Sequence, residues 1–425
     1  MDQVKFLEYV YGGFPKLDRL TIINKRFTLS FLMFIGFTIM FSGIMLTHSN
    51  RCLRSSHGEV DDPFVHVSSF LIGYIIIQVP AAWISLKFSP LKWFGRSIFA
   101  HAILLFAVAL TGNLGYGFLV VLKFFEGALA GIVFIVCHAA WKNWTPAAER
   151  STLLTFALAG GYLGDLFGSS MSIFCSSLPF WMVVCCMVGS FGVIWWLVWE
   201  RTVYETPNKH PTISDEELNR INPIIQEEIR PTEGVSCKQI ILSTPFIVLV
   251  ALNIVRSFNA RSLGYRAEDM LIISFIRLTS FPLSGYLADV LVRKTSLTIT
   301  NVRKLFVIGV TVLEAFYFFM LMNHIHFNKG RFLYLVSFLM HILYHVAYSA
   351  VSVNAVDIAP SHAGVTVAIT NIISHIIFSL GFKVEIFLQQ RDWTGVVDFI
   401  SMVVHLIVGV LFGIYGTANP ITVKG

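Results

Sequence analysis

The chain has 425 residues, of which 55% are hydrophobic and 13% are charged, and its 31 Lys and Arg against 25 Asp and Glu give a net charge of +6. Soluble domains carry about 25% charged residues, so this composition excludes a water-soluble globule. The 38 Phe exclude a disordered chain, and the long continuous apolar runs exclude a membrane β-barrel, so we expect an all-α polytopic membrane protein.

Twelve apolar runs, each bounded by charged residues, predict twelve transmembrane helices, since about 20 apolar residues cross a bilayer. Six precede residue 200 and six follow residue 239, so a polar stretch divides the chain into two six-helix bundles. In chain order the predicted helices are 27–46, 64–86, 97–111, 115–140, 151–175, 180–199, 240–257, 269–292, 305–324, 332–356, 363–388 and 394–417.

The distribution of Lys and Arg over the connecting segments predicts the orientation of the helices. Twenty of the 31 lie on the side of the N-terminus, and seven lie in the loops of the opposite side. Because cytosolic loops carry the excess of Lys and Arg, both termini are predicted to be cytosolic. The predicted organisation is a cytosolic tail (1–26), an N-terminal bundle (27–199), a cytosolic linker (200–239), a C-terminal bundle (240–417) and a cytosolic tail (418–425).

Within the linker, Ser214 precedes three acidic residues and the apolar pair Leu218 and Ile221, which predicts a short capped amphipathic helix. Two bundles joined by a polar linker are the plan of a secondary transporter, in which substrate binds between the halves near the middle of the membrane. Glycines at 160, 161 and 164, and at 189 and 192, predict close helix contacts in lipid.

Charged residues inside the predicted helices cost about 2.5–3.5 kcal/mol each and mark a pathway or an ion pair, and eight of them are candidates for such a role. Lys123 and Glu126 are three residues apart and share a helix face. They either neutralise each other or form a site in which Lys123 holds an anion and Glu126 carries a proton. The other six are Asp165, Arg256, Arg277, Glu314, Lys383 and Glu385.

Arg256 has no acidic residue within four positions on its own predicted helix. Its planar guanidinium suits a carboxylate or a phosphate, and the alternative is a side chain that extends to the membrane interface. Arg277 is expected to meet Asp289 or another acid, or to face a central cavity, and Glu314 to partner a cation of the second half. Five histidines are expected to contact backbone carbonyls rather than to carry protons: His138, His341, His345, His375 and His405.

Several strings of the sequence resemble motifs of one family. They are the run from Cys137-His138 through Trp141, Trp144 and Pro146 to Glu149-Arg150-Ser151, the linker run from Tyr204-Glu205 to His210-Pro211, Gly73-Tyr74-Ile75 with Gln78 and Pro80, Asn354 with Asp357-Ile358-Ala359-Pro360, and Ser284-Gly285 through Asp289. Together they resemble the branch of the major facilitator superfamily that contains the vesicular glutamate transporters, sialin and the sodium-phosphate cotransporters.

This resemblance implies the major facilitator fold and transport of a small organic anion such as glutamate, or of phosphate, driven by membrane potential or by a proton or sodium gradient. It places Arg256 and Lys123 at the family's basic positions and Glu126 at an acidic one, so Glu126 is the predicted proton-coupling residue. The predicted substrate-binding residues are Arg256, Lys123, Tyr74, His138 and Asn354, and the predicted structural charge partners are Glu314, Asp289 and Arg277.

The sequence also departs from the family pattern. The arginine of the first helix falls at Met45, a second acid falls at Ala130, the histidine of the second helix is displaced to His66, and the predicted helix 240–257 is short. These departures motivate an alternative hypothesis, in which the protein is a transport-deficient paralogue that acts as a sensor, scaffold or regulator in the membrane. An enzyme is not expected, because the sequence has no clustered catalytic set.

The expected partners are a small organic anion and the lipid bilayer, with no nucleic acid, and we expect a monomer. No cofactor is expected beyond a coupling ion such as H+, Na+ or Cl−. The expected location is the membrane of a synaptic or secretory vesicle, the lysosomal membrane or the plasma membrane.

Overall fold

The computed structural model describes residues 24–48, 63–111, 116–174, 178–229, 234–259, 270–322, 331–389, 391 and 394–422. Throughout these ranges the chain forms helices and connecting turns and no strand. The N-terminal bundle consists of α2 (Lys25–His48), α4 (Pro63–Lys87), α5 (Pro90–Thr111), α6 (Tyr116–Ala140), α7 (Ala147–Phe174) and α8 (Leu178–Thr202).

The C-terminal bundle has the same number of long helices in the part of the chain that the structure describes. It consists of α11 (Thr244–Asn259), α12 (Met270–Lys294), α13 (Ile299–Met322), α14 (Arg331–Asp357), α15 (Ala363–Gln389) and α16 (Thr394–Tyr415). Ten of the described helices are long and apolar enough to cross a membrane, and α7 and the 16-residue α11 complete the two sets of six. The predicted all-α fold with twelve helices is confirmed.

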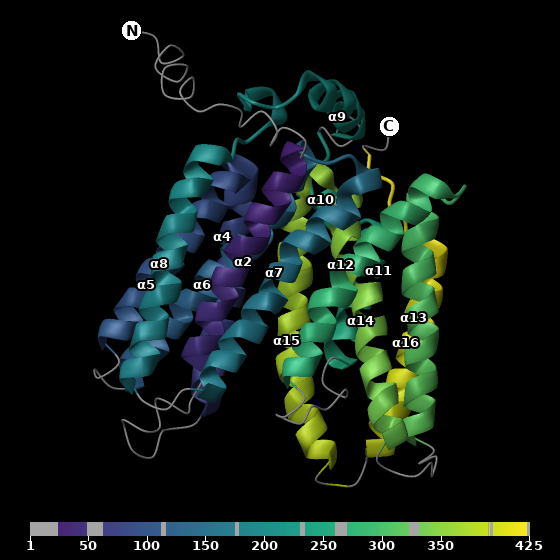
Figure 1. Ribbon diagram of the computed structural model, residues 1–425. Helices are drawn as coiled ribbons and strands as arrows, with labels where there is room; N and C mark the ends of the chain where they lie inside the picture. Colours follow the sequence, from purple (N-terminus) through teal and green to yellow (C-terminus); the bar gives the residue numbers. More distant parts are fainter. Residues whose placement is uncertain are drawn as a thin grey trace.

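The two bundles stand side by side, and the linker helix α9 (Asp215–Ile229) lies across one end of them (Figure 1). We call this end the linker side and the opposite end the far side. Ser214 Oγ accepts a hydrogen bond from the Glu217 backbone N–H at 3.2 Å, so α9 begins where the sequence predicts a capped helix. Large apolar side chains such as Val79, Leu110 and Leu335 are exposed on the outer helix faces, as expected for surfaces that meet lipid.

The seventh transmembrane helix begins later than predicted. The predicted start at residue 240 lies in the separate short helix α10 (Cys237–Ile241), which begins with a capping box at Ser236. Helix α11 then starts at Thr244, with Pro245 in its first turn, where a missing backbone N–H costs nothing. At 1.5 Å per residue, the 16 residues of α11 rise about 24 Å, which is less than the bilayer core.

The glycines of α7 bring its backbone against α2, as predicted. A Cβ atom added at Gly160 would lie 2.0 Å from the Phe34 carbonyl oxygen, and one at Gly164 would lie 2.5 Å from the Thr38 carbonyl oxygen. Only glycine permits this approach, because the obstacle is backbone that cannot rotate away.

We therefore expect Gly160→Ala to lower the thermal stability of the detergent-solubilised protein, at an overpacking cost of about 1–3 kcal/mol. Gly161→Ala is the matched control, since its added Cβ would lie 3.4 Å from the flexible Phe41 ring. Size-exclusion profiles after a temperature ramp measure both variants, and equal melting of the two would contradict the packing argument.

Candidate functional site

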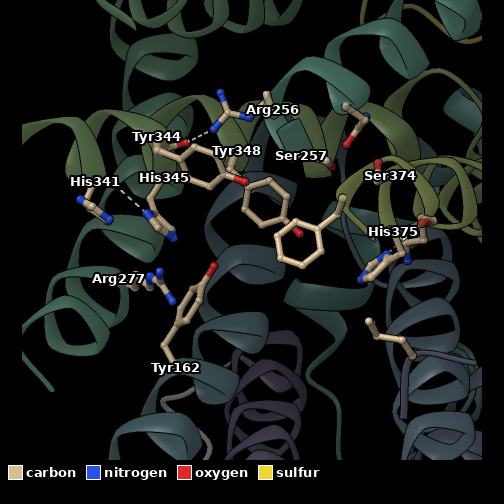
Figure 2. Close-up of a pocket in the computed structure, with 14 residues that line it drawn as sticks. Tyr162, Arg256, Ser257, Arg277, His341, Tyr344, His345, Tyr348, Ser374 and His375 are labelled. Atoms are coloured by element: carbon tan, nitrogen blue, oxygen red, sulfur yellow. Dashed lines mark hydrogen bonds between the residues drawn. The ribbon is translucent and has the colours of Figure 1, made fainter. Parts of the chain in front are cut away.

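A cavity of about 480 Å³ lies between the two bundles. Helices α4 and α7 of the N-terminal bundle and α11, α12, α14 and α15 of the C-terminal bundle contribute to its wall (Figure 2). A cavity of this volume accommodates a small organic molecule.

The C-terminal bundle presents polar and aromatic side chains to the cavity at helical spacing. From α14 these are His341, Tyr344, His345 and Tyr348, at positions i, i+3, i+4 and i+7, and α15 repeats the spacing from Asn371 to Phe378. Residues with this spacing lie on one face of a helix. Two inward-facing stripes therefore form much of the wall.

Arg256 of α11 is the cation best placed to meet a ligand in this cavity. Its side chain is 2% exposed, its Nη2 donates to the Tyr344 carbonyl oxygen, and its guanidinium lies 4.2 Å from the Tyr344 ring centroid. Its Nε and Nη1 have no hydrogen-bond partner among the described residues. A buried guanidinium with unused donors favours an anionic ligand, and the alternative position at the membrane interface is not observed.

Arg277 of α12 also lines the cavity, next to Tyr162 of α7 (Figure 2). It does not pair with Asp289, because twelve residues along a helix separate the two by about 18 Å. Asp289 instead accepts hydrogen bonds from the backbone N–H and the hydroxyl of Thr152 on α7, at 2.7 and 2.6 Å. Arg277 therefore faces the cavity, which was one of the alternatives, and is not paired with Asp289.

Glu314 of α13 lies beside Arg256 in the second half. Its Oε1 is 3.9 Å from Arg256 Nη1, and its Oε2 is 3.8 Å from His405 Nε2. These distances exceed those of direct hydrogen bonds, so the acid neutralises Arg256 from a distance without filling its donors.

Lys123 and Glu126 lie apart from the cavity, within the N-terminal bundle. Lys123 Nζ is 2.8 Å from Glu126 Oε2, and Thr47 Oγ1 lies 2.9 Å from both carboxylate oxygens. Trp181 and Leu122 help to enclose the pair. The structure thus shows the mutual neutralisation that was one of the two alternatives, and it does not bring this pair to Arg256.

The other predicted substrate-binding residues are distributed along the contact between the bundles. Tyr74 touches the cavity wall, since its hydroxyl accepts from Asn371 Nδ2 at 3.2 Å and its ring centroid is 4.6 Å from that of His375. His138 Nε2 lies 3.1 Å from Ser352 Oγ, nearer the linker side. Asn354 donates to the Thr417 carbonyl oxygen at 2.8 Å and does not line the cavity.

Four of the five histidines contact a backbone carbonyl oxygen, as expected. In each case Nδ1 lies within hydrogen-bond distance of the carbonyl oxygen four residues earlier, at His138, His345, His375 and His405. The side chains of His66, Lys383 and Glu385, and most of the predicted N-terminal tail, lie outside the described residues.

A group of buried ion pairs joins the bundles on the linker side. Asp357 at the end of α14 accepts from Arg150 Nη1 of α7 at 2.8 Å and from Arg303 Nε of α13 at 3.0 Å. Arg303 also donates to Ser151 Oγ across the interface at 2.8 Å. Asp357 lies nine residues beyond Tyr348, or about 13 Å along α14. We call this group the linker-side barrier, because it joins the two bundles between the cavity and the linker side.

Helix α9 is attached to the same region. Glu228 of α9 lies 2.8 Å from the second amino group of Arg150, and Glu217 accepts from the Lys25 backbone N–H at 2.8 Å. Glu149 binds both Arg26 at 3.0 Å and Arg220 of α9 at 2.5 Å. The string Glu149-Arg150-Ser151, which belongs to one of the motifs that resemble the family, therefore supplies much of the contact between α7, α9 and the C-terminal bundle.

Sequence reasoning missed most of the cavity wall, although a signal was present. The spacing of His341, Tyr344, His345 and Tyr348 within an apolar helix marks a polar face, and Asn253, Arg256 and Ser257 repeat it in α11. This polar face becomes apparent only when the histidines and tyrosines of the helix are considered together.

Two helical bundles around a cation-bearing cavity, joined at one end by buried ion pairs, have the architecture of a membrane transporter. Residues 26–382 match the family model described as Major Facilitator Superfamily. The chain belongs to this superfamily, whose members are transporters and not enzymes.

Relatives of known name agree with the branch that the motifs resemble. Vesicular glutamate transporter 1 of Bos taurus is 27% identical over 390 residues, which cover 82% of this chain and 69% of that protein. Probable vesicular glutamate transporter eat-4 of Caenorhabditis elegans is 28% identical over 433 residues, covering 93% and 74%. For vesicular glutamate transporter 2 of Homo sapiens the identity is 28% over 324 residues, and the chain spans 55% of that protein.

Solved structures of the superfamily share the fold. The proton:xylose symporter XylE, bound to a bromodeoxyglucose, matches with a TM-score of 0.68 at 14% identity, covering 93% of this chain and 96% of that one. FucP in the outward conformation matches with a TM-score of 0.61 at 13% identity, covering 91% and 99%.

Proposed function

We propose that this protein is a secondary active transporter of small organic anions and that Arg256 is the principal substrate-binding residue. The observation that carries the proposal is the pair of unused donors, Nε and Nη1, on a buried guanidinium that lines the cavity between the bundles. A carboxylate presents two oxygens in the geometry that a guanidinium fork binds.

The rest of the cavity suits a small carboxylate with further polar groups. Arg277 supplies a second positive charge, and Asn253, Asn371 and Ser374 supply polar groups along the wall. The relatives are named for glutamate, a dicarboxylate with one amino group. An acidic amino acid or a related dicarboxylate is therefore our first candidate substrate, and inorganic phosphate is the second.

Transport would follow alternating access. The linker-side barrier would seal the cavity from the linker side, and its opening would release substrate there. With the linker side cytosolic, as the Lys and Arg bias predicts, the cavity would receive its ligand from a vesicle lumen, a lysosome or the exterior. A coupling role for Glu126 stays a prediction, and Lys123 is more readily assigned to neutralising that acid than to substrate.

Uptake by proteoliposomes tests the proposal. The full chain is reconstituted, and accumulation of radiolabelled L-glutamate, succinate or phosphate is followed under imposed membrane potential and pH gradients. We expect accumulation of at least one probe above protein-free liposomes, with competition by the other carboxylates. Saturable binding without flux would instead identify a sensor, and the absence of both from a monodisperse preparation would refute the proposal.

A further inference from the structure

Helices α7 and α12 pack against each other and join the two bundles. On the linker side, Asp289 of α12 accepts hydrogen bonds from Thr152 of α7. Beside the cavity, the ring centroids of Tyr162 and Phe281 are 5.7 Å apart. Between these two contacts the residue numbers rise along α7 and fall along α12. The helices are therefore an antiparallel pair that stays in register from the linker side to the cavity.

The register continues past the cavity to Asp165 of α7, one of the charges predicted to lie within the membrane. Asp165 is three residues beyond Tyr162, and Ser274 of α12 is three residues before Arg277. Both therefore lie about 4.5 Å further toward the far side than these two cavity residues. Ser274 Oγ donates to Asp165 Oδ2 at 2.7 Å, and Ser169 Oγ donates to Oδ1 at 3.4 Å. The bundles are thus joined on the far side of the cavity as well as on the linker side.

The position of Asp165 within the membrane makes its contact with Ser274 dependent on conformation. A carboxylate at this depth needs polar partners, because lipid supplies none. Ser274 is 3% exposed and belongs to the other bundle, so it can donate only while α7 and α12 touch at this level. When the bundles part on the far side, water that enters from that side replaces Ser274 as the donor.

The contacts on the two sides of the cavity differ in strength. On the linker side, the buried Asp357 binds two arginines, Arg150 and Arg303. On the far side, the contact between α7 and α12 is a hydrogen bond from one hydroxyl to one carboxylate. Separating a buried ion pair costs more than exchanging a hydroxyl for water. From the conformation in this structure, the far side therefore opens more readily than the linker side.

We propose that Asp165 and Ser274 form a far-side gate that controls access of the substrate anion to Arg256. Rupture of their hydrogen bond lets α7 and α12 part and admits the anion from the far side, and its return closes the cavity behind the anion. Asp165 does not line the cavity, so it is a positioning residue that acts through the contact between the helices. The inference rests on the proposed function for the identity of the ligand.

Distances between spin labels on the far side test the gate without any ligand. Leu110 at the end of α5 and Val396 at the start of α16 are exposed positions on different bundles. Ser274→Ala removes the donor and leaves the carboxylate of Asp165 to be hydrated. Since a hydrogen bond to a charged group is lost, the ratio of far-side-open to closed molecules is expected to rise about tenfold or more. The labels should report this as a longer mean distance.

The matched control is Ser280→Ala, the same change on the same helix. Ser280 Oγ is buried without a hydrogen-bond partner among the described residues, so this variant should keep the wild-type distance. Ser274→Thr retains a hydroxyl and should restore the closed population. Asp165→Asn loses the charge and should shift the population in the same direction as Ser274→Ala, and it tests the gate if that variant does not fold. Wild-type distances in both gate variants, or an equal shift in Ser280→Ala, would overturn the inference.

Ligand binding connects the gate to Arg256. With the linker-side barrier in place, an anion reaches the cavity from the far side, so a larger open fraction raises its apparent affinity. Whichever of labelled L-glutamate, succinate and phosphate binds the wild type should bind Ser274→Ala at least about threefold more tightly, whereas a merely destabilised protein would bind less. Longer distances without tighter binding would detach the gate from the Arg256 cavity and overturn the inference. If the distances change as expected and no probe binds any variant, the gate stands and the proposed function fails.

Discussion

Replacement of Arg256 by methionine is expected to abolish uptake of the transported anion. Methionine fills much of the same buried volume but removes the charge and the donors Nε and Nη1. Each hydrogen bond to a charged partner contributes about 1.5–3 kcal/mol, so the loss of two lowers anion affinity by at least about 100-fold. Equilibrium binding and initial uptake rates in proteoliposomes measure the effect.

Two further variants separate recognition from stability. Arg256→Lys keeps the charge without the planar fork, and we expect it to retain binding that is weakened about tenfold. Arg293→Met makes the same arginine to methionine change at an exposed position on the linker side of the C-terminal bundle and should leave uptake unchanged. Wild-type uptake by a folded Arg256→Met protein would exclude Arg256 from the substrate site.

Asp357→Asn is expected to open the linker-side barrier. The substitution leaves Arg150 and Arg303, both 2% exposed or less, without the carboxylate that lies 2.8 and 3.0 Å from them. Breaking a buried pair by removing one partner costs about 3–5 kcal/mol, which is enough to invert the populations of two conformations. Because opening the barrier exposes these cations to water, the variant should favour the state that is open on the linker side.

Distances between spin labels report this change. Labels at Lys87 of α4 and Lys294 of α12, both exposed at the linker-side ends of helices from different bundles, are expected to move apart in Asp357→Asn. Adding Arg303→Gln removes the cation that Asp357→Asn leaves without a carboxylate, and Glu228 still lies 2.8 Å from Arg150, so the double variant should recover part of the closed population. Unchanged distances in a folded Asp357→Asn protein would show that these ion pairs do not hold the barrier closed.

The sequence by itself determined the fold class and part of the candidate site. Hydrophobicity is a local property, and a run of about 20 apolar residues has few alternatives to a membrane helix. The same reasoning singled out Arg256, since a lone cation in an apolar run needs a partner outside its own helix. The start of α11 was misplaced by four residues because the break before Pro245 follows turn geometry, which hydropathy does not detect.

Only the tertiary structure decided which buried charges face the cavity. Lys123 with Glu126 and Arg256 with Glu314 look alike in the sequence as charges within apolar helices. The rotation of each helix about its own axis turns Lys123 toward Thr47 inside one bundle and Arg256 toward the space between the bundles. Contacts between helices far apart in the chain set that rotation, and the same contacts place His405 beside Glu314 and Asp357 between two arginines.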